Sequence, residues 1–371
     1  MGDASNNWLT LKKRYVGLDV FRIVSVLAIC AFHTTCHLGA DYGPLQSMST
    51  MGAVFMTAFF MLSGYSLFVN YASKNIIELK NLKTFFIKRF IGVVPMYYVA
   101  AIFFILFYYG AYKIFGLGDY SILDEAILAP VEILGIQSNF HTIFGFSHNG
   151  GTWFISCILM CYLVYPLIQE VAKQISNKAK IIIILLMGFI LLYAPFVQWR
   201  FDTVTIYANP FFRILEFAIG VILASLKPQL DENKLVKKYV YNWFFVLAVD
   251  ILMIIGVTIA VHLGISVGNY MLYSWVCLPC FIAMLVGLSG VESTRLSESK
   301  AIKYGSAIGY VFFLAQLYSN KICKFVIAKF SITNNLLIIL LGWSVCIVIA
   351  LILHEIFEKP IKRALNKKLN H

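Results

Sequence analysis

The sequence predicts an all-α, polytopic integral membrane protein, a single bundle of about ten transmembrane helices with both termini in the cytoplasm. Three observations lead to this fold class. Of the 371 residues, 60% are hydrophobic and only 13% are charged, against about 25% charged in soluble domains. Apolar runs long enough to cross a hydrocarbon core recur along the whole chain. Lysine and arginine gather in alternate links between those runs, as they do in cytoplasmic loops.

The chain divides into a tail, a bundle and a second tail. Residues 1–14 are polar and end in Lys12, Lys13 and Arg14, a basic anchor that is expected to hold the N-terminus in the cytoplasm. Residues 359–371 form a basic cytoplasmic tail. The bundle occupies residues 15–358, and its apolar runs predict spans at 15–38, 50–70, 88–110, 152–170, 180–198, 209–226, 240–262, 271–290, 304–322 and 333–356.

The basic residues follow the positive-inside rule. With the N-terminus inside, the cytoplasmic segments carry 23 of the 30 Lys and Arg residues, the external segments carry five, and two lie within spans. The net charge of +12 therefore reflects membrane topology and does not indicate a nucleic-acid site. Lys321, Lys324 and Lys329 oppose the trend because they fall on the external side. They are either external residues or part of a longer or re-entrant ninth segment.

One link is much longer than the others. Residues 111–151 are placed outside and include His141 and His148. A connection of this length is usually functional or disordered. Its centre, ILAPVEILGI, is apolar, so the link is expected to fold against the membrane surface or over the bundle.

The cysteines predict neither a disulfide framework nor a metal site. All eight lie in or beside apolar runs, which is not the pattern of a secreted disulfide-rich domain. Cys277 and Cys280 have CxxC spacing, but no second pair accompanies them, so they are expected to be packing residues.

The first span is the element most strongly marked for function, because three ionisable residues interrupt it. Arg22 and His33 are eleven residues apart, which places them about 20° from alignment and about 16 Å apart along a helix axis. Arg22 then lies near one membrane face, His33 lies near the midplane, and Asp19 is placed to pair with Arg22. Such groups are costly in lipid and normally face a protein interior or a wet cavity. The simpler alternatives are a histidine bonded to a neighbouring helix and an arginine that reaches toward lipid headgroups.

Other polar residues in the spans have both a structural and a functional interpretation. Ser63 is small enough to let two helices approach closely, and no G-x-S-x-G turn marks it as a nucleophile. Lys88 and Arg89 either anchor the third span to the cytoplasmic face or bind a cytosolic anion. Arg213 and Glu216 are three residues apart in the sixth span, and a buried structural ion pair is the simplest account of them.

Segments along nearly the whole chain accompany the arrangement of Asp19, Arg22 and His33. They are FFMLSGY (59–65), KRFIGVVPMYY (88–98), TWFISCILMCYLVYPLI (152–168), RILEFAIG (213–220), YGSAIGYVFFLAQ (304–316) and HEIFEKP (354–360). In this order and spacing they resemble the acyltransferase-3 family of membrane-bound O-acyltransferases. Two sites depart from the family pattern: Ile91 and Gly92 stand where further arginines are frequent, and Gln316 stands where an aromatic run often ends in histidine.

The resemblance implies an acyltransferase of the bacterial plasma membrane. Members move an acyl group, usually acetyl, from cytosolic acyl-CoA to a hydroxyl acceptor, here expected to be a cell-envelope or exported carbohydrate. Acyl-CoA is then a co-substrate, so no bound cofactor is expected. The expected partners are the acceptor, acyl-CoA and the lipid bilayer, without nucleic acid.

The resemblance also implies roles for individual residues. His33 is expected to act as a general base or as an acyl relay. Arg22, oriented by Asp19, is expected to hold the phosphates of CoA. Lys88 and Arg89 are expected to help Arg22. The acceptor side is expected to involve Ser63, His148 and Trp153, although Trp153 equally suits an interfacial anchor.

Two other classes of protein compete with the enzyme. A transporter or flippase for glycans would also place ionisable residues near the midplane. Transporters commonly show paired halves with broken helices, and no such correspondence is visible in this sequence. A purely structural membrane protein would leave Asp19, Arg22 and His33 without a role.

Overall fold

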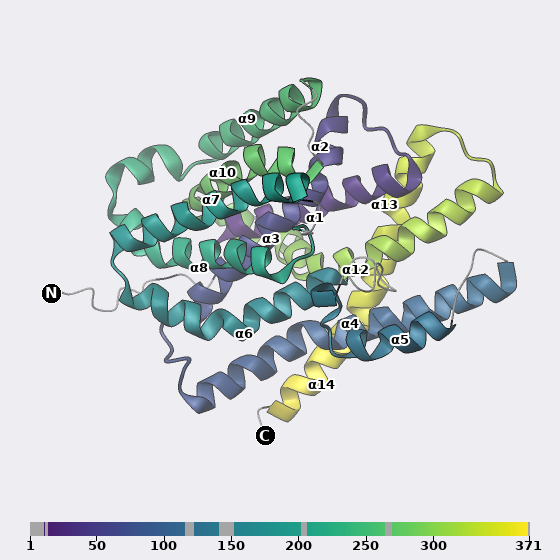
Figure 1. Ribbon diagram of the computed structural model, residues 1–371, viewed down its shortest axis with the longest axis horizontal. Coiled ribbons are helices and arrows are strands. Elements are labelled where there is room, and N and C mark those ends of the chain that lie inside the picture. Colours follow the sequence, from purple (N-terminus) through teal and green to yellow (C-terminus); the bar gives the residue numbers. More distant parts are fainter. Residues whose placement is uncertain are drawn as a thin grey trace.

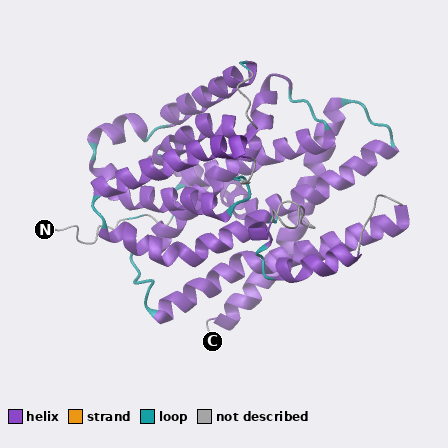
Figure 2. Cartoon of the chain, in the orientation of Figure 1, coloured by secondary structure: helices purple, strands orange, loops and turns teal. Residues whose placement is uncertain are grey.

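The computed structural model describes residues 11, 14–115, 122–140, 152–201, 206–263 and 269–369. Every regular element in these residues is a helix, and Figure 2 shows helices and loops without a strand among them. This confirms the all-α prediction. The long helices are α1 (Val16–Leu38), α3 (Phe55–Tyr71), α4 (Leu79–Phe115), α6 (Trp153–Gln174), α7 (Asn177–Phe201), α8 (Pro210–Glu232), α9 (Trp243–His262), α10 (Asn269–Gly290), α12 (Lys300–Lys329) and α13 (Asn335–Ile352).

Shorter helical pieces complete the chain. The α-helical ones are α2 (Gln46–Met51), α5 (Ile122–Ile133), α11 (Thr294–Glu298) and α14 (Lys359–Leu369). Single turns of 3₁₀-helix are η2 (Gly43–Leu45), η3 (Gly52–Val54) and η4 (Gln137–Phe140). The π-helical segments are η5 (Val236–Val240) and η6 (Leu353–Glu358), and η6 joins α13 to α14 without a break.

Within the described residues, eight helical stretches are long and apolar enough to cross a membrane, which confirms a polytopic membrane protein. The predicted spans 209–226 and 271–290 also fall on helices, α8 and α10, but these two do not meet the same criteria. The apolar part of α10 that qualifies is only Ser274–Gly290. α8 carries charged residues in its interior and is buried along most of its length. Protein neighbours therefore take the place of lipid around those charges.

The helices alternate in direction, as successive membrane crossings require. α1 and α12 run parallel, because Arg22 on α1 meets Ser306 on α12 and, further along both helices, His33 meets Gln316. Seven long helices, α3, α4, α6, α7, α8, α9 and α10, lie between them in the chain, and an odd number of intervening crossings makes two helices parallel. Other contacts agree. The helical stretch from α2 to α3 is antiparallel to α1, since Thr35 meets Ser49 on α2 and Arg22 meets Ser66 on α3. α10 is also antiparallel to α1 (Gly17 with Leu288, Phe21 with Phe281), while α3 and α8 are parallel (Thr57 with Glu216, Gly64 with Val221).

Because successive helices alternate in direction, many of the cations lie at the end of the bundle where α1 begins. In Figure 1 the N-terminus and the α6–α7 and α8–α9 links lie toward the left, and the α12–α13 link lies toward the right. By the positive-inside rule the basic end is expected to face the cytoplasm. The cations at this end come from different segments of the chain and include Arg14, Arg89, Lys227, Arg295 and Lys362.

Glycines at helix contacts set the spacing around α1 and α3. A Cβ atom built on Gly64 of α3 would lie 2.0 Å from the carbonyl oxygen of Phe217 on α8, and one on Gly220 of α8 would lie 1.9 Å from that of Met61. Only glycine lets these two backbones approach so closely, which is how small residues pack helices in membranes. The contact brings α3, which carries Ser63, against α8 in the centre of the bundle.

Two predicted segments contain more helix than their prediction gave them: the long link at 111–151 and the ninth span at 304–322. α4 continues to Phe115, and α5 folds back against α4, since the hydroxyls of Tyr97 and Tyr98 each donate to a backbone carbonyl at the end of α5 over 2.5 Å. α12 continues to Lys329 and includes Lys321 and Lys324. Of the two alternatives for these lysines, the longer ninth helix is the one observed.

Candidate active site

A charged cluster lies where α1 begins. Arg22 Nη1 donates to Asp19 Oδ1 over 3.1 Å and to Ser306 Oγ on α12 over 2.7 Å. Arg22 Nη2 donates to Ser66 Oγ on α3 over 3.2 Å. Ser306 Oγ donates in turn to Asp19 Oδ1 over 2.7 Å. Arg14 Nε donates to the other carboxylate oxygen of Asp19 over 2.5 Å. Contacts from α1, α3 and α12 therefore fix the direction of the Arg22 guanidinium.

This cluster keeps a net positive charge and a solvent-accessible face. Two guanidinium groups, of Arg14 and Arg22, share the single carboxylate of Asp19. The Asp19 side chain is only 10% exposed, whereas the Arg22 side chain is 27% exposed. Because a guanidinium has five N–H donors, Arg22 can bind an anion without giving up Asp19.

Arg22 faces a cavity of about 370 Å³, which we call the Arg22 cavity. Three cations from different helices line it: Arg22 from α1, Arg89 from α4 and Lys362 from α14. Ser63 of α3 lines it as well. Most of the remaining wall is apolar or aromatic and consists of Met56, Phe59, Gly92, Val93, Phe154, Ile158, Tyr162, Ser306, Ala307, Gly309, Tyr310 and Phe313. A basic entrance followed by an apolar interior suits a ligand with an anionic part and an uncharged part.

The structure separates the two predicted cations of α4. Arg89 lines the Arg22 cavity, with Cζ 5.8 Å from the ring centre of Tyr71 and 5.9 Å from that of Tyr162. Its buried Nε has no hydrogen-bond partner among the described residues. Lys88 is exposed and is not among the residues that line the cavity. A Cβ atom built on Gly92, one turn beyond Arg89, would have no other atom within 4 Å.

A histidine–glutamine pair lies deeper along α1. His33 Nδ1 lies 2.6 Å from Gln316 Oε1 on α12. The Nε2 amide of Gln316 donates to the Val26 carbonyl over 3.4 Å, so Oε1 is the atom that accepts from His33. This network assigns the proton to Nδ1 and leaves a lone pair on Nε2 of a neutral imidazole. Gln316 thus orients His33 as a proton acceptor.

The Arg22 cavity extends from the charged cluster toward this pair. Its wall includes Phe313 of α12, which is three residues before Gln316, or about 4.5 Å along a helix axis. Its basic wall includes Arg22, which lies about 16 Å from His33 along α1. The cavity therefore lies in the interval between the cation and the imidazole, and neither His33 nor Gln316 is among the residues that line it.

A second charged group, on α8, is closed to solvent. Arg213 Nη1 donates to both oxygens of Glu216 over 2.7 and 2.8 Å. Thr57 of α3 donates to Glu216 over 2.8 Å, and Arg213 Nε donates to the Tyr207 carbonyl over 2.8 Å. The side chains of Arg213 and Glu216 are 0% and 1% exposed. These two residues lie together as the structural ion pair that their spacing predicts.

Trp153, one of the three expected acceptor contacts, packs on the closed ion pair. The ring centres of Trp153, Phe60 and Tyr207 lie 5.5, 5.5 and 5.3 Å from Arg213 Cζ, which is the geometry of cation–π contacts. Trp153 is half-buried, so part of its ring stays accessible. His148 lies outside the described residues.

Three further residues complete the site. From the sequence, Gln316 was named only as a departure from the pattern of the resembled family, and no functional role was predicted for Ser306 or Lys362. Ser306 and Gln316 are polar residues in a largely apolar ninth span, and this contrast is the signal that the sequence offers for both. Lys362 was grouped with the basic tail, where its charge was explained by topology alone. Its position in the wall of the Arg22 cavity depends on how α14 packs against α4 and η6.

Comparison with known protein families gives a match along most of the chain. Residues 15–355 match the acyltransferase-3 family, which is described as an acyltransferase domain. The match covers the charged cluster except for Arg14, the Arg22 cavity except for Lys362, and the His33–Gln316 pair. No curated protein and no solved structure matches the chain.

Proposed function

Since the chain belongs to the acyltransferase-3 family, we propose that it transfers an acyl group, most simply acetyl, from cytosolic acyl-CoA to a hydroxyl of a cell-envelope or exported carbohydrate. A membrane-spanning protein of an acyltransferase family can bind a soluble donor on one side of the membrane and an acceptor in the membrane or on the other side. The proposed setting is the bacterial plasma membrane, with the basic end of the bundle in the cytoplasm.

The observation that carries the proposal is the Arg22 cavity. Its cations, Arg22, Arg89 and Lys362, offer charge-assisted hydrogen bonds to phosphate. Its apolar interior suits the pantetheine arm of CoA, and about 16 Å separates the cation from His33 along α1, the order of length of that arm. The thioester would then lie near Nε2 of His33.

In the general-base route, His33 Nε2 removes the proton from the acceptor hydroxyl while the hydroxyl oxygen attacks the thioester carbonyl carbon. The new C–O bond forms, the C–S bond breaks, and the sulfur leaves with the bonding electron pair. The proton held by His33 then passes to this thiolate. The products are an ester and free CoA.

In the relay route, His33 Nε2 itself attacks the carbonyl carbon, the C–S bond breaks and the leaving thiolate takes up the Nδ1 proton. The acceptor hydroxyl then attacks the acylated imidazole. The C–N bond breaks, and the hydroxyl proton returns to the ring. In both routes Gln316 orients the imidazole, and Asp19 holds Arg22 in place.

The acceptor is expected to approach from the end of the bundle opposite the basic one. Trp153 offers an aromatic face there, His148 belongs to the same side of the predicted topology, and Ser63 lines the cavity between the two ends. Aromatic faces and hydroxyl groups suit a carbohydrate. Exchange of the 111–151 link with that of a relative is expected to change which acceptor is used.

The test is release of free thiol from acetyl-CoA by the purified, reconstituted protein, offered a mixture of cell-envelope glycans. We expect release that requires both glycan and His33, with His33→Ala slowing it by about 10² to 10⁴-fold, the usual contribution of a general base. His262→Ala, which changes an exposed histidine at the end of α9, is the matched control and should keep the wild-type rate.

Two outcomes would redirect the proposal. Full activity of His33→Ala would remove both routes through this residue. No thiol release with any acyl-CoA from correctly folded protein would favour the glycan transporter instead. Acetylated His33, detected by mass spectrometry after incubation with acetyl-CoA alone, would select the relay over the general base.

A further inference from the structure

A basic groove opens beside the Arg22 cavity, and the mechanism above does not use it. The groove has a volume of about 770 Å³ and lies between α12, η6 and α14. Four of the residues that line it are cations of one short segment, Lys359, Lys362, Arg363 and Lys367. Three of these, at positions 359, 363 and 367, are spaced four apart and therefore share one face of α14.

The groove and the Arg22 cavity are contiguous. Ala307 and Lys362 line both. The Arg22 cavity alone, at about 370 Å³, is at the small end of the range for ligand pockets, so it suits the arm of a CoA thioester better than the whole molecule. The groove supplies the additional volume at the basic end, outside the apolar interior.

Two of the groove cations are available to a ligand. Lys359 Nζ donates to Glu355 and Lys362 Nζ donates to Glu358, each over 2.5 Å, so carboxylates already pair with these lysines. Arg363 and Lys367 are exposed, and no carboxylate of the described residues lies within ion-pair distance of either. Arginine binds phosphate through two parallel N–H donors, which makes Arg363 the strongest anion ligand in the groove.

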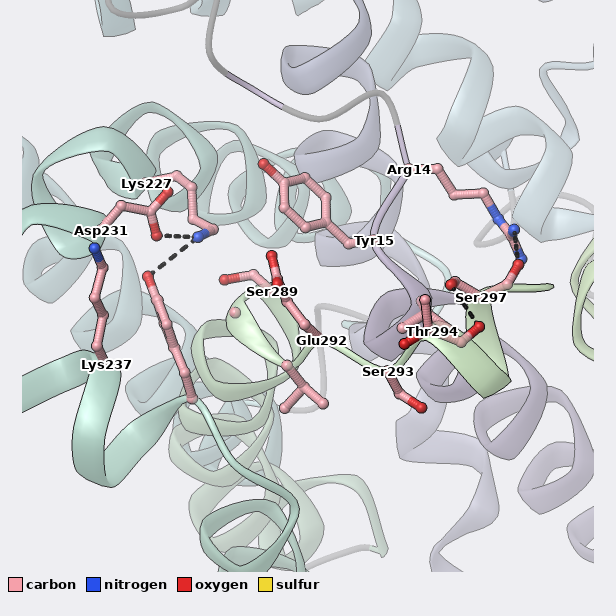
Figure 3. Close-up of a pocket in the computed structure, with 14 residues that line it drawn as sticks. Arg14, Tyr15, Lys227, Asp231, Lys237, Ser289, Glu292, Ser293, Thr294 and Ser297 are labelled. Carbon is pink, nitrogen blue, oxygen red and sulfur yellow. Dashed lines mark hydrogen bonds and ion pairs between the residues drawn. The ribbon is translucent and has the colours of Figure 1, made fainter. Parts of the chain in front are cut away.

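A second pocket at the basic end lacks these properties. Figure 3 shows this pocket, of about 890 Å³, with Lys227 turned toward Asp231 and with Glu292 in its wall. Its other paired cation, Arg14, is bound to Asp19. Among the described residues it shares no lining residue with the Arg22 cavity. Two carboxylates accompany three cations in its wall, whereas the α14 groove has one carboxylate, Glu358, and four cations. The smaller excess of positive charge and the lack of a lining residue shared with the Arg22 cavity make it a poor place for the phosphates of the donor.

From this contrast we infer that the α14 groove binds the adenosine 3′,5′-bisphosphate end of acyl-CoA, with Arg363 and Lys367 as phosphate ligands, while the pantetheine arm enters the Arg22 cavity past Lys362. The inference rests on the proposed acyl-CoA donor and extends it to a subsite. The C-terminal helix is then part of the donor site, not only a basic membrane anchor. The same cations would also suit the phosphate of an anionic lipid headgroup, so the experiment must separate the two sources.

The test measures binding of CoA and of adenosine 3′,5′-bisphosphate by titration calorimetry to the full-length protein in nanodiscs of neutral phosphatidylcholine. Wild type should bind both. The double variant Arg363→Gln, Lys367→Gln should bind each at least about tenfold more weakly, because two charge-assisted contacts are lost. Lys237→Gln, an exposed cation of the pocket in Figure 3, is the matched control and should bind both as wild type does. An unchanged thermal unfolding midpoint would show that the double variant is folded.

The outcomes are distinguishable. If wild type binds CoA and the double variant binds it equally well, the groove is not the nucleotide subsite, although the donor assignment stands. If, in addition, phosphatidylglycerol in the nanodisc raises the unfolding temperature of wild type but not of the double variant, the groove is a lipid site. If wild type binds neither CoA nor acetyl-CoA, the proposed donor itself is wrong, and this inference fails with it.

Discussion

Two arginine–carboxylate pairs with the same spacing of three residues lie inside this bundle, and their surroundings differ sharply. Asp19 and Arg22 lie on α1, and Arg213 and Glu216 lie on α8. The Arg22 side chain is 27% exposed and faces a cavity, whereas the Arg213 side chain is 0% exposed and is enclosed by aromatic rings. In the first pair a second arginine, Arg14, shares the carboxylate; in the second pair both carboxylate oxygens are bonded to the one arginine.

The comparison teaches that an ion pair inside a membrane span does not by itself mark a functional site. A closed pair with its charges balanced stabilises one arrangement of helices, because breaking it leaves a buried charge. A pair with surplus positive charge and an open face can bind an anion. Access and charge balance therefore separate the two roles, and each can be tested by substitution.

The largest expected effect is on stability, at the closed pair. Glu216→Ala leaves the guanidinium of Arg213 buried without its carboxylate, and we expect a loss of about 3–5 kcal/mol in the free energy of unfolding. The measurement is denaturant or thermal unfolding of the purified protein in detergent. Glu355→Ala removes a carboxylate from an exposed pair with Lys359 and is the control, with no measurable change expected. Wild-type stability in Glu216→Ala would mean that the closed pair contributes little to the bundle.

The next effect is on donor binding, at the open pair. Arg22→Gln removes the charge while keeping polar contacts to the neighbouring serines, and Asp19 remains paired with Arg14. We expect the KM for acyl-CoA to rise by about 10 to 100-fold, with a smaller loss of stability than in Glu216→Ala. The measurement is steady-state thiol release over a range of acetyl-CoA concentrations. An unchanged KM with a large loss of stability would make the open pair structural as well.

The smallest expected effect is on the KM for acyl-CoA, compared between substitutions of two adjacent cations of α4. Lys88→Gln changes an exposed residue outside the Arg22 cavity, and we expect a KM within about twofold of wild type. Arg89→Gln changes a residue in the cavity wall and is expected to raise the KM by about 3 to 10-fold. The same thiol-release assay compares them directly. Equal effects of the two substitutions would show that general positive charge at this end, not the cavity, attracts the donor.

The sequence predicted much of the fold and part of the site. The apolar runs predicted helices, and every predicted span falls on helical segments. Two of these helices do not meet the criteria for a membrane span: α8, which is charged, and α10, whose apolar part is too short. The spacing of Asp19, Arg22 and His33 predicted one functional stripe, and the structure places Arg22 at a cavity and His33 beside Gln316. The same reasoning grouped Lys88 with Arg89, although only Arg89 reaches the cavity.

What the sequence determined by itself is local: which segments are helical and apolar, which links are basic, and which residues share a face of one helix. These properties follow from the helical repeat and from the cost of placing charge in lipid, so they need no knowledge of neighbouring helices. Only the tertiary structure shows which side chains from different helices contact one another. Ser306 and Gln316 meet Arg22 and His33 across 284 and 283 residues of chain. Such contacts depend on the rotation and spacing of packed helices. Close approaches such as that of Gly64 to α8 determine this spacing, and the hydropathy of the sequence does not predict it.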